Sequence, residues 1–365
     1  MVNPFINQLE SLSAQNKRRT LITRAGLDFS SNDYIGLAAH AGIRERLVEA
    51  LQQGLALGSG GSRLLRGNHL EHEDLEAYGA TFFGAEAALF MSSGYLANLA
   101  IFTTLPSRGD VIVFDEYVHA SAKEGIHASL SKRSKFAHND ANACEEAVKR
   151  ARLNGAEQVW IAVESVYSMD GDVSPLADLM DIADRYDATL IVDEAHATGV
   201  HGPGGRGLSA IFEGRENLIA MHTCGKALGQ MGALVTMSAV VKEYLINAAR
   251  SFIYTTAPTP LAAVAVQAAL QVVEDEPQRR IDLLALTDYA RSVFPQAPGS
   301  TQILPLIMGT DEAAFKSAQR LQGQGFDIRA IRTPTVPENT ARLRLSMTLN
   351  VTRADIDALA LAVNT

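Results

Sequence analysis

Two short segments contain residue types that an enzyme could use for covalent chemistry on a carbonyl group. The first is the apolar run 189–192, which ends in Asp193 and is followed by His196. The second is Thr223-Cys-Gly-Lys226, where a lysine lies beside a glycine. A lysine amine forms a Schiff base with an aldehyde, and a buried carboxylate favours a protonated ring nitrogen. These two groups together could hold pyridoxal phosphate (PLP), whose ring accepts electrons.

The surroundings of both residues favour this interpretation. Gly225 and the small residues up to Gly232 let backbone and cofactor approach closely around Lys226. A cationic ring beside a buried lysine lowers the pKa of the amine, which must be neutral to attack an aldehyde. Asp193 ends an apolar run, and a buried carboxylate is costly unless it meets a cation. The alternative is that Asp193 only caps the following segment.

A possible phosphate site lies at Phe90-Met-Ser-Ser-Gly-Tyr-Leu-Ala-Asn98, which follows a predicted strand and begins a predicted helix. The free N–H groups and the dipole of a helix start suit an anion, and Gly94 allows close approach. We include Ser93, Gly94 and Tyr95 among the candidate cofactor residues. A glycine turn before a helix is common, so this signal is weak by itself.

Further polar residues follow other predicted strands, where ligands bind in open α/β sheets. His119 comes after the strand 111–114 and could stack on a pyridine ring, and Ser168 follows the strand 159–163. Ser168 and His196 could bond the oxygen substituent of the ring. Thr223 could bind the phosphate or the turn of the lysine. Taken alone, either histidine is more often structural, but the position of His119 at the carboxyl end of a strand favours a functional role.

The elements that must position these residues alternate along the chain. Short apolar runs predict strands at 88–91, 111–114, 159–163, 189–192, 218–221 and 234–237. Helical periodicity predicts helices near 70–83, 95–105, 141–154, 175–187, 241–251 and 261–275. This alternation indicates an α/β fold with a mainly parallel sheet covered on both faces.

The 365 residues exceed the size of a usual single core, roughly 250 to 300 residues. We predict an N-terminal segment (1–40), a large PLP-binding domain (41–275) and a small C-terminal domain (276–365). Two helical segments around strands near 301–307 and 341–347 make the small domain α+β, and the N-terminal segment joins it.

Composition excludes several classes of function. A net charge of −9 argues against a nucleic-acid surface, and no apolar run approaches the ~18 residues that cross a membrane. The N-terminus lacks the pattern of a signal peptide, so the cytoplasm is expected. Cys144 and Cys224 predict neither disulfides nor a metal site. The cluster Lys132-Arg-Ser-Lys135 reads as solvated surface charge.

As a whole, these motifs resemble the α-oxoamine synthases, a family of PLP-dependent transferases of fold type I. The resemblance runs nearly end to end, from Phe29 to Arg344. Its most specific part is Gly58-Ser-Gly-Gly-Ser-Arg-Leu-Leu-Arg-Gly-Asn-His69 with His72, Leu75 and Glu76. It implies a large domain with a mainly parallel sheet and a smaller α+β C-terminal domain.

The resemblance also implies roles for residues. Lys226 would form the Schiff base, Asp193 would meet the ring nitrogen and His119 would stack on the ring. A further hypothesis is that His119 polarises the attacked carbonyl. The residues placed around the rest of the cofactor are Ser93, Gly94, Tyr95, Ser168, His196 and Thr223.

On the substrate side, Arg344 would bind the amino-acid carboxylate through its planar fork, with Asn32 assisting and Thr335 nearby. Arg342 has the weaker claim to that role. One of Lys17, Arg18 and Arg19 would meet the acyl substrate, and we choose Arg19. Which of the three does so stays open, because the segment before Phe29 is short for the family.

The segments 330–337 and 340–345 are similar to family members that condense L-alanine with a pimeloyl thioester in biotin biosynthesis. The carrier of that thioester, coenzyme A or a carrier protein, stays open. The resemblance implies a homodimer with shared active sites, in which Thr255 and Thr256 reach the cofactor phosphate of the partner. The sequence around Thr255 differs from the family pattern.

Three alternatives remain. Other α-oxoamine synthases condense glycine or serine with a different thioester. A ligand-sensing regulator on the same fold would append a DNA-binding module, which we do not expect here. An NAD-dependent dehydrogenase is the weakest, because Gly58-Ser-Gly-Gly61 does not follow a convincing strand.

Overall fold

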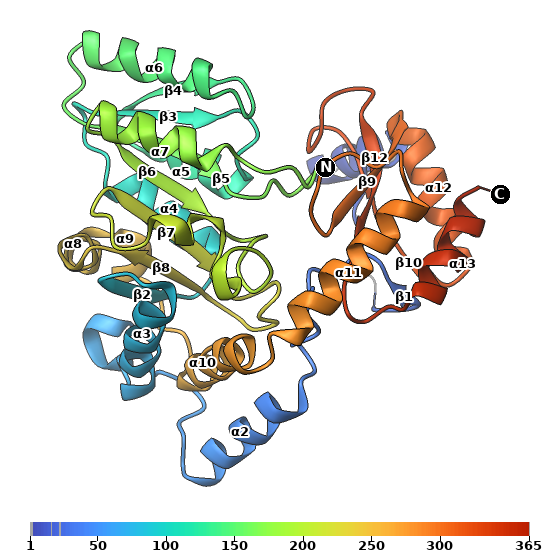
Figure 1. Cartoon of the computed structure of the whole chain (residues 1–365), viewed down its shortest axis with the longest axis horizontal. Helices are drawn as coiled ribbons and strands as arrows, with labels where there is room; N and C mark the ends of the chain where they lie inside the picture. Colours follow the sequence, from blue (N-terminus) through green and yellow to red (C-terminus); the bar gives the residue numbers. More distant parts are fainter. Residues whose placement is uncertain (1–2, 16, 22, 365) are drawn as a thin grey trace. The chain divides into compact units, whose positions relative to one another are not determined.

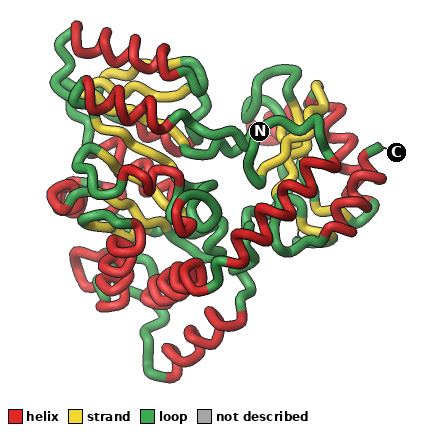
Figure 2. The backbone as a smooth tube through the Cα atoms, viewed as in Figure 1, coloured by secondary structure: helices red, strands yellow, loops and turns green. Residues whose placement is uncertain are grey.

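The computed structural model describes residues 3–15, 17–21 and 23–364, which divide into two compact units. The larger unit comprises Asn32–Ser168 and Asp172–Asp282, and the smaller comprises the residues up to Ser31, Met169–Gly171 and those from Leu283 onward. These cuts differ from the predicted ones at 40 and 275. One reason is that β1 (Leu27–Asp28) pairs with β10 (Phe326–Asp327) within the smaller unit. Figures 1 and 2 show both units.

A seven-stranded sheet forms the centre of the larger unit, in the order β2-β8-β7-β6-β5-β3-β4. Only β8 runs antiparallel to its neighbours, so the sheet is mainly parallel, as predicted. The strands are β2 (Ala87–Met91), β3 (Val111–Asp115), β4 (Lys132–Phe136), β5 (Val159–Glu164), β6 (Thr189–Asp193), β7 (Leu218–Thr223) and β8 (Ala233–Met237).

The edge strand β4 was not predicted, because it coincides with the basic cluster 132–135. Its Lys132, Arg133 and Lys135 are exposed, which confirms the interpretation as solvated charge. β4 pairs only with β3, and charged residues on an edge strand discourage pairing with another chain. Because three of its five residues are charged, β4 lacks the apolar pattern by which the other strands were predicted.

Helices cover both faces of this sheet (Figure 1). Alternate residues of β3 illustrate the two cores: Ile112 and Phe114 pack with apolar residues of α4, α5, α8 and α9, while Val111 and Val113 pack with those of α6 and α7. The helices of this unit are α2 (Ala41–Gln52), α3 (Leu70–Phe83), α4 (Gly94–Thr104), α5 (Ala120–Ala128), α6 (Ala141–Leu153), α7 (Leu176–Arg185), α8 (Ala239–Ala248), α9 (Arg250–Ile253) and α10 (Pro260–Asp275), with short helical turns at Arg63–Gly67, Pro203–Gly205 and Leu208–Phe212.

The predicted helices are present within a few residues of their expected bounds. One difference concerns the segment 241–251, which forms two helices. The break lies at Ala249, whose extended backbone (φ −73°, ψ 104°) ends α8 before α9 begins. Because Ala249 is fully buried, packing rather than local propensity sets this break.

The smaller unit has the predicted α+β character. Its three-stranded antiparallel sheet has the order β11-β12-β9, and β12 carries Arg342 and Arg344. The remaining elements are α1 (Pro4–Ala14), α11 (Gln278–Val293, which crosses the cut between the units), β9 (Ile303–Gly309), α12 (Asp311–Gly323), β11 (Ala330–Ile331), β12 (Ala341–Ser346) and α13 (Arg353–Val363).

Several predicted absences can be compared with the part of the chain that the structure describes. Both cysteines are buried and unbridged. Among the described residues, no cluster of His, Cys, Asp and Glu side chains could hold a metal ion. No helix of residues 3–15, 17–21 and 23–364 has the length and apolar character needed to span a membrane.

Candidate active site

A cavity in the larger unit lies where the central strands end. β5, β6 and β7 end at Glu164, Asp193 and Thr223, and all three residues line it. Helix starts complete the wall, as expected at the carboxyl edge of a parallel sheet. The lining residues are Gly94, Tyr95, Asn98, His119, Ser121, Glu164, Asp193, Ala195, Met221, Thr223 and Lys226. The structure thus brings together the predicted Gly94, Tyr95, His119, Asp193, Thr223 and Lys226.

Lys226 is part of a chain of hydrogen bonds. Its Nζ lies 2.6 Å from His196 Nε2, and His196 Nδ1 lies 2.6 Å from the Tyr34 hydroxyl. Tyr34 also donates to Asn32 Oδ1 at 3.1 Å. The chain of contacts therefore holds the amine of Lys226 in one place.

Asp193 is oriented by a second chain. The buried carboxylate accepts from the Ala195 backbone N–H at 3.0 Å and from Asn98 Nδ2 at 2.9 Å. Asn98 Nδ2 also donates to Ser121 Oγ at 3.0 Å. These bonds fix the rotamer of Asp193 at the end of β6 and leave the group able to meet a cation in the cavity.

His119 precedes α5 and caps it. Its Nδ1 accepts from the Ser121 backbone N–H at 3.2 Å and lies 2.8 Å from Ser121 Oγ. Burial lowers the pKa of His119, and the charge of Lys226 adds to this effect, while Asp193 opposes it. The ring is therefore neutral near pH 7 and carries its proton on Nε2. Such a ring offers a flat face and one N–H donor to a ligand.

Glu164 is a cavity residue that the sequence analysis did not select. It is buried (3% exposed), and its Oε1 has no hydrogen-bond partner among the described residues. Burial raises the pKa of Glu164 well above its ordinary value, and the negative charge of Asp193 raises it further. The carboxyl group of Glu164 is therefore harder to ionise than that of an exposed glutamate. Its position at the end of a predicted strand was the available signal.

Asn98, Ser121 and Tyr34 were also missed as site residues. Asn98 is the one polar side chain on the buried part of the otherwise apolar α4, which was a usable signal. Ser121 and Tyr34 are set by contacts between distant segments, which local sequence does not reveal.

The start of α4 approaches the end of β7 closely. Ser93 caps this helix by accepting from the Leu96 N–H at 3.2 Å, and Gly94 is its first residue. A Cβ atom added at Gly94 would lie 3.3 Å from Thr223 Oγ1 and 3.3 Å from Met221 Sδ. The absence of a side chain there leaves room at a helix N-terminus, where phosphate groups bind readily.

Other predicted cofactor residues lie outside the lining of this cavity. Ser168 is buried in the loop after β5. Thr255 and Thr256 follow α9, in a segment held to the Gly58–His69 motif by the Ala257 N–H bond to Gly61 O at 2.9 Å. The predicted roles of these three residues therefore stay proposals.

In the smaller unit, the two arginines of β12 have different partners. Arg342 is buried, forms an ion pair with Asp170 and donates to Met169 O at 3.3 Å. Arg344, also buried, donates through Nη1 to Ser346 Oγ at 2.9 Å. The ion pair with Asp170 gives Arg342 a structural partner, which agrees with its weaker claim to a substrate carboxylate.

The smaller unit also contains a cavity of about 600 Å³. Arg19 and Thr335, both predicted substrate residues, line it together with Lys17 and Arg18. Arg332, which was not predicted, joins them and lies 5.1 Å from the ring centre of Phe315. Leu9 and Leu12 supply an apolar part of the wall. The arrangement suits a ligand with an apolar chain and an anionic group.

The residues around the larger unit's cavity fit PLP. A held lysine amine suits the aldehyde, and an oriented carboxylate suits the ring nitrogen. The helix start at Gly94 suits the phosphate. The sequence and structure of known proteins agree with this chemistry.

The family model of aminotransferase class I and II matches residues 24–363. The 8-amino-7-oxononanoate synthase of Chromobacterium violaceum is 41% identical, over 98% of this chain and 96% of its own length. The crystal structure of the 8-amino-7-oxononanoate synthase of Francisella tularensis superposes with a TM-score of 0.78 at 29% identity, covering 93% of this chain and 96% of that one.

The fold is also that of a serine palmitoyltransferase from S. paucimobilis, whose structure holds a PLP–myriocin aldimine. That superposition has a TM-score of 0.90 at 24% identity and covers 98% of this chain and 95% of the other. The larger unit's sheet, its flanking helices and the small antiparallel sheet are those of PLP enzymes of fold type I. The chain belongs to the aminotransferase class I and II family and, within it, to the α-oxoamine synthases, which are PLP-dependent acyltransferases.

Proposed function

We propose that this chain condenses L-alanine with pimeloyl-CoA or a pimeloyl carrier-protein thioester, as 8-amino-7-oxononanoate synthases do. Carbon dioxide and the free thiol carrier are the other products. The observation that carries the proposal is that Asp193 and Lys226 line the same cavity. Asp193 ends β6, and Lys226 follows the neighbouring strand β7. Relatives of this name that match nearly the whole chain support the choice of substrates.

When bound, PLP supplies an aldehyde for a Schiff base and a ring that accepts electrons from the substrate. Lys226 removes the proton from the alanine Cα and returns a proton after decarboxylation. Its hydrogen bond to His196 holds the amine in place for both transfers. Asp193, fixed by Asn98, keeps a proton on the ring nitrogen, which makes the ring a better electron acceptor.

His119 contributes a neutral ring. We propose that its face packs on the cofactor and that its Nε2 proton polarises the thioester carbonyl that is attacked. The lowered pKa supports this role, because a neutral imidazole stacks without placing a second positive charge beside the protonated ring nitrogen.

Ser168 and His196 are proposed to bond the ring oxygen, and Ser93, Gly94, Tyr95 and Thr223 to surround the remaining cofactor atoms. The Lys226 contact places His196 beside the point of attachment, which supports its role.

Substrate recognition is proposed for Arg344, which binds the alanine carboxylate with help from Asn32. The cavity of the smaller unit lined by Arg19 and Thr335 is proposed to receive the acyl substrate. A pimeloyl group has an apolar chain and a terminal carboxylate, which matches the leucine and arginine lining.

We further propose a cytoplasmic homodimer in which Thr255 and Thr256 of one protomer contact the cofactor phosphate of its partner. Both residues lie outside the lining of their own protomer's cavity, which is consistent with a role in the other site. Light scattering together with cofactor loading of a Thr256→Ala protein tests this arrangement.

Product mass spectrometry tests the reaction directly. The purified protein, loaded with PLP, is incubated with L-alanine and pimeloyl-CoA, and 8-amino-7-oxononanoate is expected. Parallel incubations with glycine or serine and with other thioesters identify a different α-oxoamine synthase. PLP binding without turnover of any pair would instead favour a ligand-sensing protein.

A further inference from the structure

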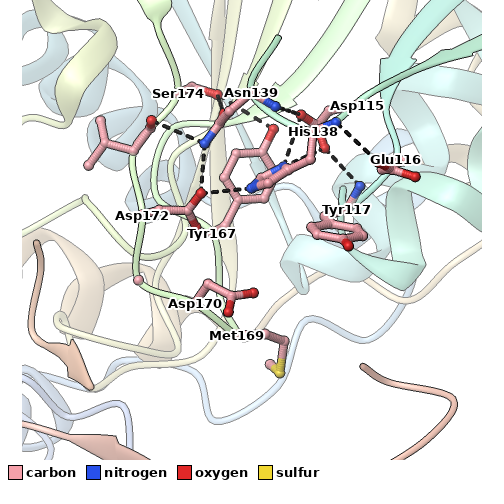
Figure 3. A network of polar contacts seen from close by, with 12 residues as sticks. Asp115, Glu116, Tyr117, His138, Asn139, Tyr167, Met169, Asp170, Asp172 and Ser174 are labelled. Atoms are coloured by element: carbon pink, nitrogen blue, oxygen red, sulfur yellow. Dashed lines mark hydrogen bonds and ion pairs between the residues drawn. The ribbon is translucent and has the colours of Figure 1, made fainter. Parts of the chain in front are cut away.

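A charged cluster outside the cavity has no part in the chemistry described above (Figure 3). His138 lies between two carboxylates: its Nδ1 is 2.9 Å from Asp115 Oδ1, and its Nε2 is 2.7 Å from Asp172 Oδ2. Its ring also packs against Tyr117 and Tyr167, with ring centres 4.5 and 4.4 Å away. His138 is the second residue after β4 and belongs to none of the predicted site motifs.

The geometry defines the charge of this ring. Ionised carboxylates only accept hydrogen bonds, so both ring nitrogens of His138 must donate and the ring is an imidazolium. Asp115 is already a fixed acceptor, because it receives the backbone N–H groups of Tyr117 and Asn139 at 2.7 and 2.8 Å. Burial opposes the charge of His138, but the hydrogen bonds to Asp115 and Asp172 raise its pKa to about 10.

The cluster joins two loops that lead to the cavity. Asp115 is the last residue of β3 and lies in the segment that reaches His119, which lines the cavity. Asp172 ends the loop after β5 that contains Ser168, and its carbonyl accepts the Tyr167 N–H at 3.0 Å. A link between Asp115 and Asp172 therefore constrains the separation of the segments that carry His119 and Ser168.

A second contact strengthens the same link. Asn139, in the left-handed conformation (φ 53°), donates its backbone N–H to Asp115 Oδ2 and its side-chain Nδ2 to Asp172 Oδ2, the latter at 2.7 Å. Its Oδ1 accepts from Ser174 Oγ at 3.3 Å. Two consecutive residues, His138 and Asn139, thus join the same pair of carboxylates (Figure 3).

We propose that His138 is a positioning residue for the cofactor: by joining Asp115 to Asp172, its imidazolium sets the places of His119 and Ser168. The inference rests on the proposed contacts of these two residues with PLP. Ser168 bonds the ring oxygen in that proposal, so a shift of its loop changes the electronic state of the bound cofactor as well as its affinity.

The test compares His138→Gln with His40→Gln. The imidazolium of His138 donates to the two carboxylates from nitrogens on opposite sides of its ring. A glutamine has a single amide nitrogen and cannot replace both hydrogen bonds. His40 is the control, because it also contacts a carboxylate, that of Glu276 at 3.3 Å, but caps α2 away from the cavity. The apoproteins are titrated with PLP, the absorbance of the bound cofactor is recorded, and urea unfolding is measured for each variant.

In His138→Gln we expect the Kd for PLP to rise about tenfold, because this corresponds to the loss of one well-placed hydrogen bond. The absorbance maximum of the bound cofactor should also shift. His40→Gln should keep the wild-type Kd and spectrum whatever stability it loses. A His138→Gln protein that is merely less stable, with an unchanged Kd and spectrum, would overturn the proposal.

Asp172→Asn provides a milder variant in case His138→Gln does not fold, because the amide oxygen can still accept from His138. A smaller rise in Kd with a spectral shift in the same direction is expected, and an unchanged Kd and spectrum contradicts the inference. PLP binding is measured without turnover, so a protein that shows these effects but makes no product would refute the proposed function and leave this inference standing.

Discussion

Glu164 and Asp193 are in register on the neighbouring parallel strands β5 and β6, and both line the cavity that also contains Lys226. Two ionised carboxylates so placed would repel each other, and burial of Glu164 adds to the cost of its charge. Ionisation of Glu164 is therefore disfavoured beside Asp193, the residue that is proposed to meet the ring nitrogen.

Replacement of Glu164 by glutamine should be well tolerated, since the amide has the shape of the protonated acid. We expect the Kd for PLP to stay within about twofold, a change smaller than one hydrogen bond. Glu164→Ala, which leaves a space, is the contrasting variant. Strong loss of PLP binding in Glu164→Gln alone would mean that the carboxylate is needed in its charged form.

The same pair predicts a dependence of stability on pH. Because the pKa of Glu164 is raised from 4.5 in the folded protein, the unfolded chain releases this proton first, and wild-type stability falls as pH rises above about 4.5. Glu164→Gln lacks this contribution, so its unfolding free energy relative to wild type should increase between pH 5 and pH 8, approximate limits set by that linkage. Urea unfolding across this range measures the difference.

Removal of the Lys226 amine should abolish condensation. In Lys226→Ala we expect activity to fall about a thousandfold or more, and borohydride should no longer fix the cofactor to the chain. Lys316→Ala, at an exposed position of α12, is the control and should retain both properties. A borohydride-stable link in Lys226→Ala would assign the attachment to another lysine.

Arg344 and Arg342 should respond differently to replacement by lysine. Arg344→Lys keeps the charge but loses the planar fork, so KM for alanine should rise about tenfold with a smaller change in kcat. Arg342→Lys disturbs the ion pair with Asp170 and should mainly lower stability. Steady-state kinetics with varied alanine, alongside thermal unfolding, separates the two effects. Equal effects of both variants on KM would contradict the assignment.

The imidazolium of His138 predicts a second pH effect, on stability. The ring faces the titratable groups Asp115, Tyr117, Tyr167 and Asp172, and Glu116 accepts the backbone N–H of His138. The raised pKa gives a stabilisation that is complete below the ordinary 6.5 and is lost as pH rises to about 10.

The unfolding free energies of wild type and His138→Gln should therefore differ by about 3 kcal/mol near pH 6, where the carboxylates are ionised, the cost of breaking a buried ion pair, and converge as the pH approaches about 10. Urea unfolding at several pH values measures this difference. A constant difference across that range would show that the ring does not carry the charge.

Local signals were sufficient to select Lys226 and Asp193, which the structure places on one cavity. Asp193 ends an apolar strand and Lys226 lies in a turn of small residues, and periodicity placed most helices and strands because one apolar face of each must be buried. The strand β4 escaped because an edge strand with charged residues has no such pattern.

The residues that orient those groups could not be found in this way. Tyr34 meets His196 across 162 positions of sequence, and Asn98 meets Asp193 across 95. Such pairs form only when segments far apart in the sequence pack together in the folded chain.

The sequence by itself thus determined the order and type of most elements and singled out Lys226 and Asp193 as candidates, because these depend on patterns within a few residues. Only the tertiary structure decided which side chains hold these two residues, that burial raises the pKa of Glu164, and that His138 links two loops. Burial and hydrogen bonding between distant segments control those properties, and both exist only once the sheet has assembled.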